Sequence, residues 1–183
     1  MSPHTPSPKL HGSLLLADPT LRDGIFNKSV ILIGEHSADD GAFGLILNHP
    51  SGKTVGDVLP SEEFSALARL PVHLGGPVSR NNLTFAIFEE KKGKLDFALR
   101  IAVDEALARM NHPGTMVRAF AGYSGWSRDQ LEDELDRDSW TVTEPTANLL
   151  NLAHDITLWK TLMRSLSPYH KIVANAPDEI LSN

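Results

Sequence analysis

The sequence predicts an α+β domain built on a largely antiparallel sheet. Apolar runs rich in β-branched residues come in closely spaced pairs, which is the pattern of β-hairpins. Helical patterns are concentrated in the second half of the chain, so strands and helices are segregated and do not alternate. The chain has 183 residues, of which 41% are hydrophobic and 22% charged. This composition allows one domain to bury a core.

The first half is expected to form three strands followed by two short helical pieces. Apolar runs predict strands at 13–17, 29–34 and 42–47, the last two joined as a hairpin through a turn at 36–41. The polar stretch 48–52 then breaks the strand pattern. Pro60 separates the helical pieces predicted at 55–59 and 62–70, and Ser61 is a suitable N-cap for the second.

The second half is expected to hold a second hairpin and most of the helices. Strands are predicted at 72–74, 83–88, 95–103, 116–121 and 140–143, with the charged turn EEKKGK joining the second and third. Helices are predicted at 104–110, 127–137, 147–152 and 156–166. Ser127 and Gln130 match the S-x-x-Q capping box at the start of the 127–137 helix.

The ends of the chain are expected to lie outside the domain proper. Residues 1–11 contain three prolines and no apolar run, so they predict a flexible arm. Residues 12–167 form the predicted domain. Residues 168–183 are expected to be a tail with an extended apolar piece, Ile172–Ala174.

Cysteine content and charge narrow the classes of function. The chain has no cysteine, which excludes disulfides and cysteine nucleophiles and fits a reducing compartment, so we expect a cytoplasmic protein. No stretch approaches the roughly 20 apolar residues that span a bilayer, and no signal peptide is recognisable, so we expect no membrane partner.

The formal net charge is −6, and residues 91–94 form the only tight basic cluster. We therefore expect no nucleic-acid partner, because phosphate neutralisation needs a basic surface.

The stretch GYSGWS, residues 122–127, places a serine between two glycines after an apolar run. A nucleophile elbow has the pattern G-x-S-x-G, but Trp126 takes the place of its second glycine. We therefore expect a strand-to-helix turn and no catalytic residue. The alternative is a hydrolase that uses Ser124 with a histidine such as His49 or His154. It requires a histidine nitrogen within hydrogen-bond reach of the serine oxygen.

Two further features bear on ligand binding. Gly75-Gly76-Pro77 lacks the lysine and the spacing of a phosphate loop. It predicts either a plain turn or a pocket wall where glycines let a ligand approach backbone amides. The eight histidines include no H-E-x-x-H pair, so we expect no metal and no other cofactor.

Five stretches, taken in order, resemble the YqgE/AlgH family of bacterial proteins. They cover the chain from Gly12 to about Leu166 and consist of GSLLLADPTLRDGIFNKSVILIGEH, GAFGLILNHP, PVHLGGPVSRNNLTFAIF, FAGYSGWSRDQLEDELDRDSW and LWKTLM. The resemblance implies a single-domain fold, an antiparallel β-barrel-like sheet flanked by α-helices. It implies no established reaction. Members are often labelled transcriptional regulators, yet this sequence has no recognisable helix-turn-helix.

The family pattern differs from this chain at two motifs. Members typically have N-R-P where this chain has Asn48-His49-Pro50. The change to His49 weakens the idea that a fixed positive charge there binds an anion. Members typically have G-Y-A-G-W where this chain has Ser124 in the middle of the motif. An alanine at that position implies that the shared function does not need the hydroxyl.

The leading hypothesis is a non-enzymatic binding module with a regulatory role, whose partner is a small molecule or a protein. The candidate binding residues fall in or beside loops at strand ends, where ligand sites tend to lie; they are Asn48, His49, Gly75, Gly76, Pro77, Tyr123 and Trp126. Their convergence on one concave pocket would support the hypothesis, and their dispersal would count against it. A DNA-binding regulator, which requires a basic patch, is the alternative, and the Ser124 hydrolase is the third hypothesis. The sequence identifies neither the partner nor the oligomeric state.

Overall fold

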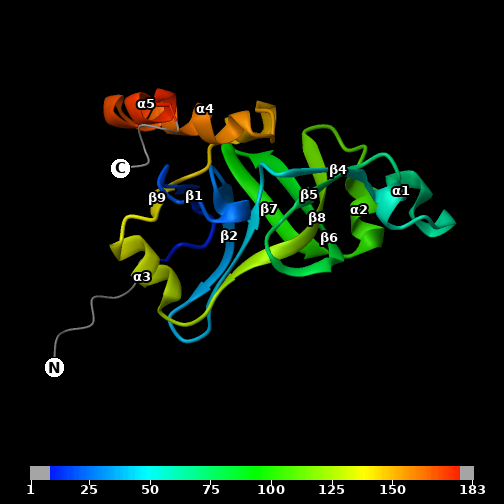
Figure 1. Ribbon diagram of the computed structural model, residues 1–183. Coiled ribbons are helices and arrows are strands. Elements are labelled where there is room, and N and C mark those ends of the chain that lie inside the picture. The colour runs from blue at the N-terminus through cyan, green and yellow to red at the C-terminus, as the bar shows by residue number, and fades with distance from the viewer. Residues whose placement is uncertain (1–8, 178–183) are drawn as a thin grey trace.

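Two long strands, β6 and β8, run through the middle of a curled sheet (Figure 1). The computed structural model describes residues 9–177. Its strands are β1 (Leu14–Ala17), β2 (Val30–Ser37), β3 (Gly41–Ile46), β4 (Pro50–Thr54), β5 (Pro71–Leu74), β6 (Val78–Lys91), β7 (Lys94–Ile101), β8 (Thr115–Trp126) and β9 (Trp140–Thr143). Its helices are α1 (Val55–Val58), α2 (Val103–Arg109), α3 (Gln130–Asp136), α4 (Thr157–Leu166) and α5 (Pro168–Asn175). Short 3-10 helices are η1 (Gly24–Phe26), η2 (Glu62–Leu67) and η3 (Ala147–Asn151).

The sheet is mixed and open, which corrects the antiparallel β-barrel-like sheet that the family resemblance implies. Its strands follow the order β4-β5-β8-β3-β2-β1-β9, and β6 pairs with both β8 and β7. Among the described strands, β5 and β8 run parallel, with Val72 opposite Ala119, and the other named pairs are antiparallel. The β6–β7 hairpin and α2 lie between β5 and β8 in the chain, and this long connection returns the chain in the same direction. The result is one α+β domain with a curled, open sheet and helices at its periphery.

Most predicted elements are confirmed, including the β2–β3 and β6–β7 hairpins. Two predictions about the polar and glycine-rich stretches are wrong. Residues 50–54 form strand β4 at the edge of the sheet, where polar side chains are compatible with a strand exposed to solvent. The GYSGWS stretch is no turn, because β8 continues through it to Trp126 and pairs there with β3.

Helix termini also differ from the prediction. Helix α3 begins at Gln130, not at residue 127, and its N-cap is Asp129 in the left-handed conformation. Half of the predicted capping box is present, since the Ser127 N–H donates to Gln130 Oε1 at 3.0 Å. The piece expected to be extended, Ile172–Ala174, lies within helix α5. Ser167 caps this helix, accepting the His170 N–H at 3.3 Å. The expected arm falls mostly, and the end of the expected tail wholly, outside the described residues.

The core is divided by the sheet into layers. Side chains of β1 and β2 alternate between two clusters, with Leu14 and Leu32 on the side of α4 and α5 and with Leu15 and Ile33 on the side of α3. Both faces of these strands are therefore buried, which explains their continuous apolar runs. A third cluster packs α1, α2 and η2 against β5, β6 and β8 at the opposite end of the molecule (Figure 1). Within residues 9–177, no helix is long and apolar enough to cross a membrane.

Candidate functional site

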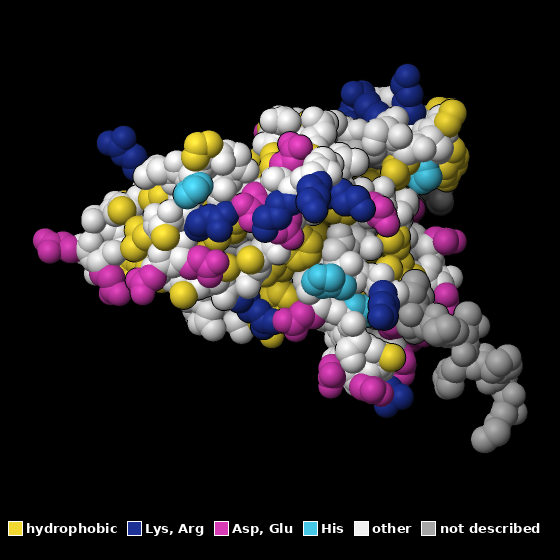
Figure 2. Space-filling model, turned by 180° about the vertical axis from the view of Figure 1, so that it is seen from behind, with side chains coloured by type: hydrophobic (Ala, Val, Ile, Leu, Met, Phe, Trp, Pro, Cys, Tyr) yellow, Lys and Arg dark blue, Asp and Glu magenta, His cyan; other side chains and the backbone are white. Residues whose placement is uncertain are grey.

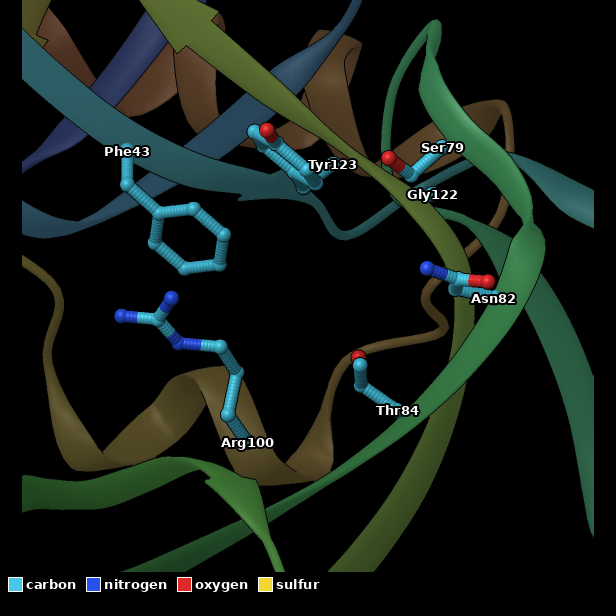
Figure 3. A pocket seen from close by; sticks show the side chains of 7 residues that line it. All are labelled: Phe43, Ser79, Asn82, Thr84, Arg100, Gly122 and Tyr123. Atoms are coloured by element: carbon cyan, nitrogen blue, oxygen red, sulfur yellow. The ribbon is translucent and has the colours of Figure 1, made fainter.

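A cavity of about 370 Å³ opens beside Gly122 and Tyr123 of β8, and we call it the bulge cavity. Its walls are formed by Phe43, Ser79, Asn82, Thr84, Arg100, Gly122 and Tyr123. Figure 3 shows Phe43 and Arg100 on one side and Ser79, Asn82 and Thr84 on the other. The volume lies within the roughly 300–1,000 Å³ typical of small-ligand pockets.

Irregular strand pairing creates this cavity. The β6–β8 register jumps from Val78 opposite Tyr123 to Leu83 opposite Ala121, so residues 79–82 of β6 face only Gly122 on β8. The extra β6 residues arch away from β8 and leave room between the strands, as β-bulges do. Gly122 takes a φ of +71°, a conformation that glycine adopts without strain.

A second bulge places Arg100 in the wall. In the β6–β7 pairing, Phe85 lies opposite Ile101 and Ala86 opposite Leu99, which leaves Arg100 as the extra residue. Its φ of +54° turns the side chain over the Phe43 ring, with the guanidinium carbon 4.3 Å from the ring centroid. The guanidinium also forms an ion pair with Glu35.

The aromatic side of the bulge cavity is preorganised. The Phe43 and Tyr123 rings are 5.2 Å apart at 39°, so both are held by packing before any ligand arrives. Ser79, on the opposite wall, also has a positive φ, of +51°. A non-glycine residue in this region costs about 1–3 kcal/mol, and such strain tends to collect at functional sites.

Gly75 and Gly76, predicted as a pocket wall, instead pack against protein backbone. A Cβ on Gly75 would lie 2.3 Å from the Gly122 carbonyl oxygen, and one on Gly76 would lie 2.1 Å from the Tyr123 carbonyl. Both residues are buried, and they let the chain after β5 approach β8 closely. Pro77, which follows them, is exposed just before β6.

Asn48 and His49 lie together at a different place, around a cavity of about 420 Å³ that we call the His49 cavity. Its walls are Asn27, Lys28, Asn48, His49, Pro50 and Ile156. Asn48 is buried and holds the start of β2, accepting the Val30 N–H at 2.8 Å and donating to the Lys28 carbonyl at 2.9 Å. Burial lowers the pKa of His49 below its usual value.

Trp126 belongs to the core and not to a cavity. Its indole Nε1 and that of Trp140 both donate to one oxygen of Glu134, each at 2.8 Å. The two indole rings meet edge to face with centroids 6.2 Å apart. Glu134 therefore fixes α3 against the ends of β8 and β9.

Ser124 is fully buried within β8, and its hydroxyl donates to the Gly75 carbonyl at 3.1 Å. The histidine partner that a hydrolase requires is not found beside it among residues 9–177. His154 directs its ring nitrogens to Arg118 and to the Leu149 carbonyl. This arrangement gives Ser124 a structural role between β8 and the segment after β5.

The seven predicted residues thus do not line one pocket. Tyr123 lines the bulge cavity, Asn48 and His49 line the His49 cavity, and the others lie in backbone contacts, in the core or on the surface. Six residues that line the bulge cavity were not predicted from the sequence as site residues, namely Phe43, Ser79, Asn82, Thr84, Arg100 and Gly122. The polar run SRNN before an apolar strand, and a lone arginine within LDFALRIAV, were the available signals.

Charge on the surface is mixed. Figure 2 shows basic side chains interspersed with acidic ones over the face that it displays. In the basic cluster at 91–94, Lys91 pairs with Glu89 at 2.9 Å and with Asp96 at 2.5 Å. Within the described part of the chain, no three histidine or acidic side chains are grouped to hold a metal ion.

Comparison with known proteins gives a consistent result. A model of the AlgH-like family matches residues 14–171. A UPF0301 protein of Cytophaga hutchinsonii is 33% identical over 177 residues, covering 91% of this chain and 94% of that relative. A UPF0301 protein of Streptomyces coelicolor is also 33% identical and covers 98% of both chains. The names of these relatives state no activity or ligand.

Two solved structures share the fold. The solution structure of the AlgH protein from Pseudomonas aeruginosa has a TM-score of 0.66 and 24% identity, covering 97% of this chain and 99% of that chain. A crystal structure of a Corynebacterium diphtheriae protein has a TM-score of 0.71 and 21% identity, covering 91% of this chain and 92% of that chain.

Proposed function

The chain belongs to the AlgH-like family, and we propose that it is a non-enzymatic binding module whose small-molecule ligand occupies the bulge cavity. One observation carries this proposal: two β-bulges, one in β6 against β8 and one in β7 against β6, flank the same cavity. Bulges interrupt backbone pairing and are over-represented beside functional sites, where they re-aim side chains. Here they open the space at Gly122 and direct Arg100 across Phe43.

The lining favours a small heteroaromatic ligand. A flat ring packs favourably against Phe43 and Tyr123, which are already fixed relative to each other. The polar edge of such a ring would meet the side chains of Ser79, Asn82 and Thr84, which offer both donors and acceptors. Glu35 already neutralises Arg100, so the ligand needs no negative charge for binding there.

Two other functions are less well supported. Ser124 gives its hydroxyl to a backbone carbonyl and is fully buried, so a nucleophilic role has no geometric basis. DNA binding stays a prediction, which comes from the labelling of family members as transcriptional regulators. The pairing of Lys91 with two carboxylates argues against it. The cytoplasmic location expected from the absence of cysteine also stays a prediction, which cell fractionation would check.

The binding proposal is tested by titrating the protein with adenine, nicotinamide and indole and following backbone amide signals by NMR. We expect at least one probe to shift the signals of Thr84 and Tyr123 saturably. Thr84→Val and Asn82→Ala should each weaken that probe about tenfold, the effect of one lost polar contact. Thr141→Val, on β9 and away from the cavity, is the matched control and should bind like the wild type.

Two results would overturn the proposal. The first is the absence of saturable shifts at millimolar concentrations of all three probes. The second is binding that neither Thr84→Val nor Asn82→Ala weakens, because the ligand would then lie elsewhere. A fluorescent duplex titrated at low salt in the same buffer tests the DNA alternative separately, because salt-sensitive binding would favour it.

A further inference from the structure

Strand β9 lies at an edge of the sheet, where β1 is its one partner among the described strands (Figure 1). Hydrogen bonds between antiparallel strands alternate, so every second residue directs its backbone N–H and C=O away from the partner strand. The Asp18 N–H donates to the Ser139 carbonyl at 2.9 Å just before β9 begins. The alternation therefore gives the next bonds to Thr141 and Thr143, and it leaves Val142 facing outward.

The pairing on the other side of β1 leads to the same assignment. The Ala17 N–H donates to the Ser29 carbonyl at 3.0 Å, and Leu15 lies opposite Ile31 of β2. The backbone groups of Leu15 are thus directed to β2, so they cannot bond to Val142, which lies opposite on β9. Within residues 9–177, the N–H and carbonyl of Val142 have no hydrogen-bond partner. Val142 is 41% exposed, so another chain can reach these groups.

The other strands with a free side carry features that hinder pairing, and β9 does not. Edge strands commonly use proline, lysine or a bulge to prevent the addition of another strand. Strand β4, at the opposite edge, has Pro50, Lys53 and an irregular register against β5. Strand β7, whose named partner is β6, has a bulge at Arg100 and charged residues along its length. Strand β9 has the sequence WTVT and a regular register against β1, so its edge is open to an extended chain.

A pocket of about 330 Å³ adjoins the end of β9, and we call it the β9 pocket. Its apolar walls are leucines of β1, of the segment after β9 and of α4, namely Leu14, Leu149, Leu152, Leu162 and Leu166. Thr143 also lines it and lies opposite Leu14, whose side chain is on the α4 side of the sheet. A residue added beside Thr143 directs its side chain to the same face, because neighbouring residues across strands share a face. The free edge and the pocket can therefore hold one extended chain together.

Charge indicates the kind of chain that fits. Glu144 is the only charged side chain among the described residues that line the β9 pocket, and it is exposed. No ion pair within the described chain involves it. Lys160 and Arg164 of α4 do not line the pocket. Before the other end of β9, the exposed residues 136–138 are two aspartates and one arginine. Both ends of the strand thus favour a basic partner.

We propose that the free edge of β9 binds an extended, basic peptide segment of a partner protein. The segment pairs with the backbone of Val142 and places one apolar side chain in the β9 pocket, and its lysine or arginine pairs with Glu144. Strand addition of this kind obtains affinity from main-chain hydrogen bonds and specificity from pockets for alternate side chains. The site is separate from the bulge cavity and does not depend on the function proposed for that cavity.

The test uses a synthetic peptide, lysine-threonine-leucine-threonine-lysine with both ends capped, titrated against the full chain. Backbone amide signals and their hydrogen exchange are followed by NMR. We expect saturable shifts at Val142 and Thr143, and slower exchange of the Val142 N–H because the added strand protects it. The Thr141 N–H already bonds to β1 and is the internal reference, whose exchange should stay unchanged.

Variants of the protein and of the peptide separate strand addition from other binding. Val142→Pro removes the outward N–H without removing a bond to β1, so it should weaken the peptide about tenfold. Glu144→Gln should weaken it severalfold and reduce the effect of salt. The matched control is Glu105→Gln, on α2 at the other end of the molecule (Figure 1), which should bind like the wild type. A peptide with aspartate in place of leucine should not bind, because the pocket walls are apolar.

A second form of the peptide keeps the test independent of how Val142→Pro folds. Methylation of the two threonine amides removes the peptide's own donors and leaves the protein unchanged. The proposal is overturned if the original peptide causes no saturable shift at β9, or if Val142→Pro and the methylated peptide bind as tightly as the originals. It is also overturned if sedimentation shows a dimer that Val142→Pro dissociates while no peptide binds, because the edge then pairs with a second copy. Probes of the bulge cavity are followed at Thr84 and Tyr123, so failure of one site leaves the other unaffected.

Discussion

Replacing Glu134 by alanine tests how helix α3 is attached to the sheet. One carboxylate oxygen of Glu134 accepts the indole N–H of both Trp126 and Trp140 at 2.8 Å. Each tryptophan is only 6% exposed, so water has little access to either N–H once the carboxylate is gone. The substitution therefore leaves two buried donors without their partner.

The expected loss follows from these two bonds. A hydrogen bond to a charged group contributes about 1.5–3 kcal/mol, so two give about 3–6 kcal/mol. Glu134 is itself half-buried, so we take the lower end, about 3 kcal/mol. For a domain of this size that corresponds to a fall in melting temperature of about 6–12 °C. Glu134→Gln keeps an oxygen that accepts both N–H groups and loses only the charge, so about half of the effect is expected.

Urea denaturation followed by tryptophan fluorescence measures these differences, and circular dichroism gives the melting temperatures. Asp136→Ala is the control, since Asp136 lies exposed on the same helix, and surface substitutions usually stay within about 0.5 kcal/mol. The Asp136→Ala control should be the most stable of the three variants, Glu134→Gln less stable, and Glu134→Ala the least stable. If Glu134→Ala were as stable as the control, the indole–carboxylate bonds would not hold α3, and the reasoning would be refuted.

Three further predictions concern other parts of the core. Ser124→Ala should lower the free energy of unfolding in urea by only about 0.5–1.5 kcal/mol, because the Gly75 carbonyl keeps a backbone hydrogen bond; a loss above about 3 kcal/mol would contradict this. Gly76→Ala should abolish folding, because its Cβ would lie 2.1 Å from the backbone of β8. Circular dichroism would show the loss of secondary structure, and a normally folded variant would contradict the packing of Gly76 against β8. Burial, with a nearby guanidinium, lowers the pKa of His73 and of His154 from 6.5 to about 4. The unfolded chain therefore binds up to two more protons in this range, so stability should fall as the pH drops from about 6.5 to about 4; a flat urea-denaturation profile there would argue against burial of the two neutral rings.

Part of the candidate site could be predicted from sequence. Asn48 and His49 were selected as loop residues at a strand end, and they do line a cavity, as Tyr123 lines another. The choice of Gly75 and Gly76 rested on sound physics, since glycine permits close approach. The group that approaches is the backbone of β8, however, and nothing in the local sequence distinguishes a ligand from a neighbouring strand.

The sequence by itself determined most strands, the two hairpins, most helices and the family, because hydrophobic periodicity and turn residues act over short distances. Tertiary structure decided the parallel pairing of β5 with β8, the extension of β8 through Ser124, and both cavities. Arg100 shows the reason: in the sequence it is one residue of a regular strand, and only the register of β7 against β6 makes it a bulge that faces Phe43. Register depends on which strands pair over the whole sheet, so residues distant in the chain fix it together.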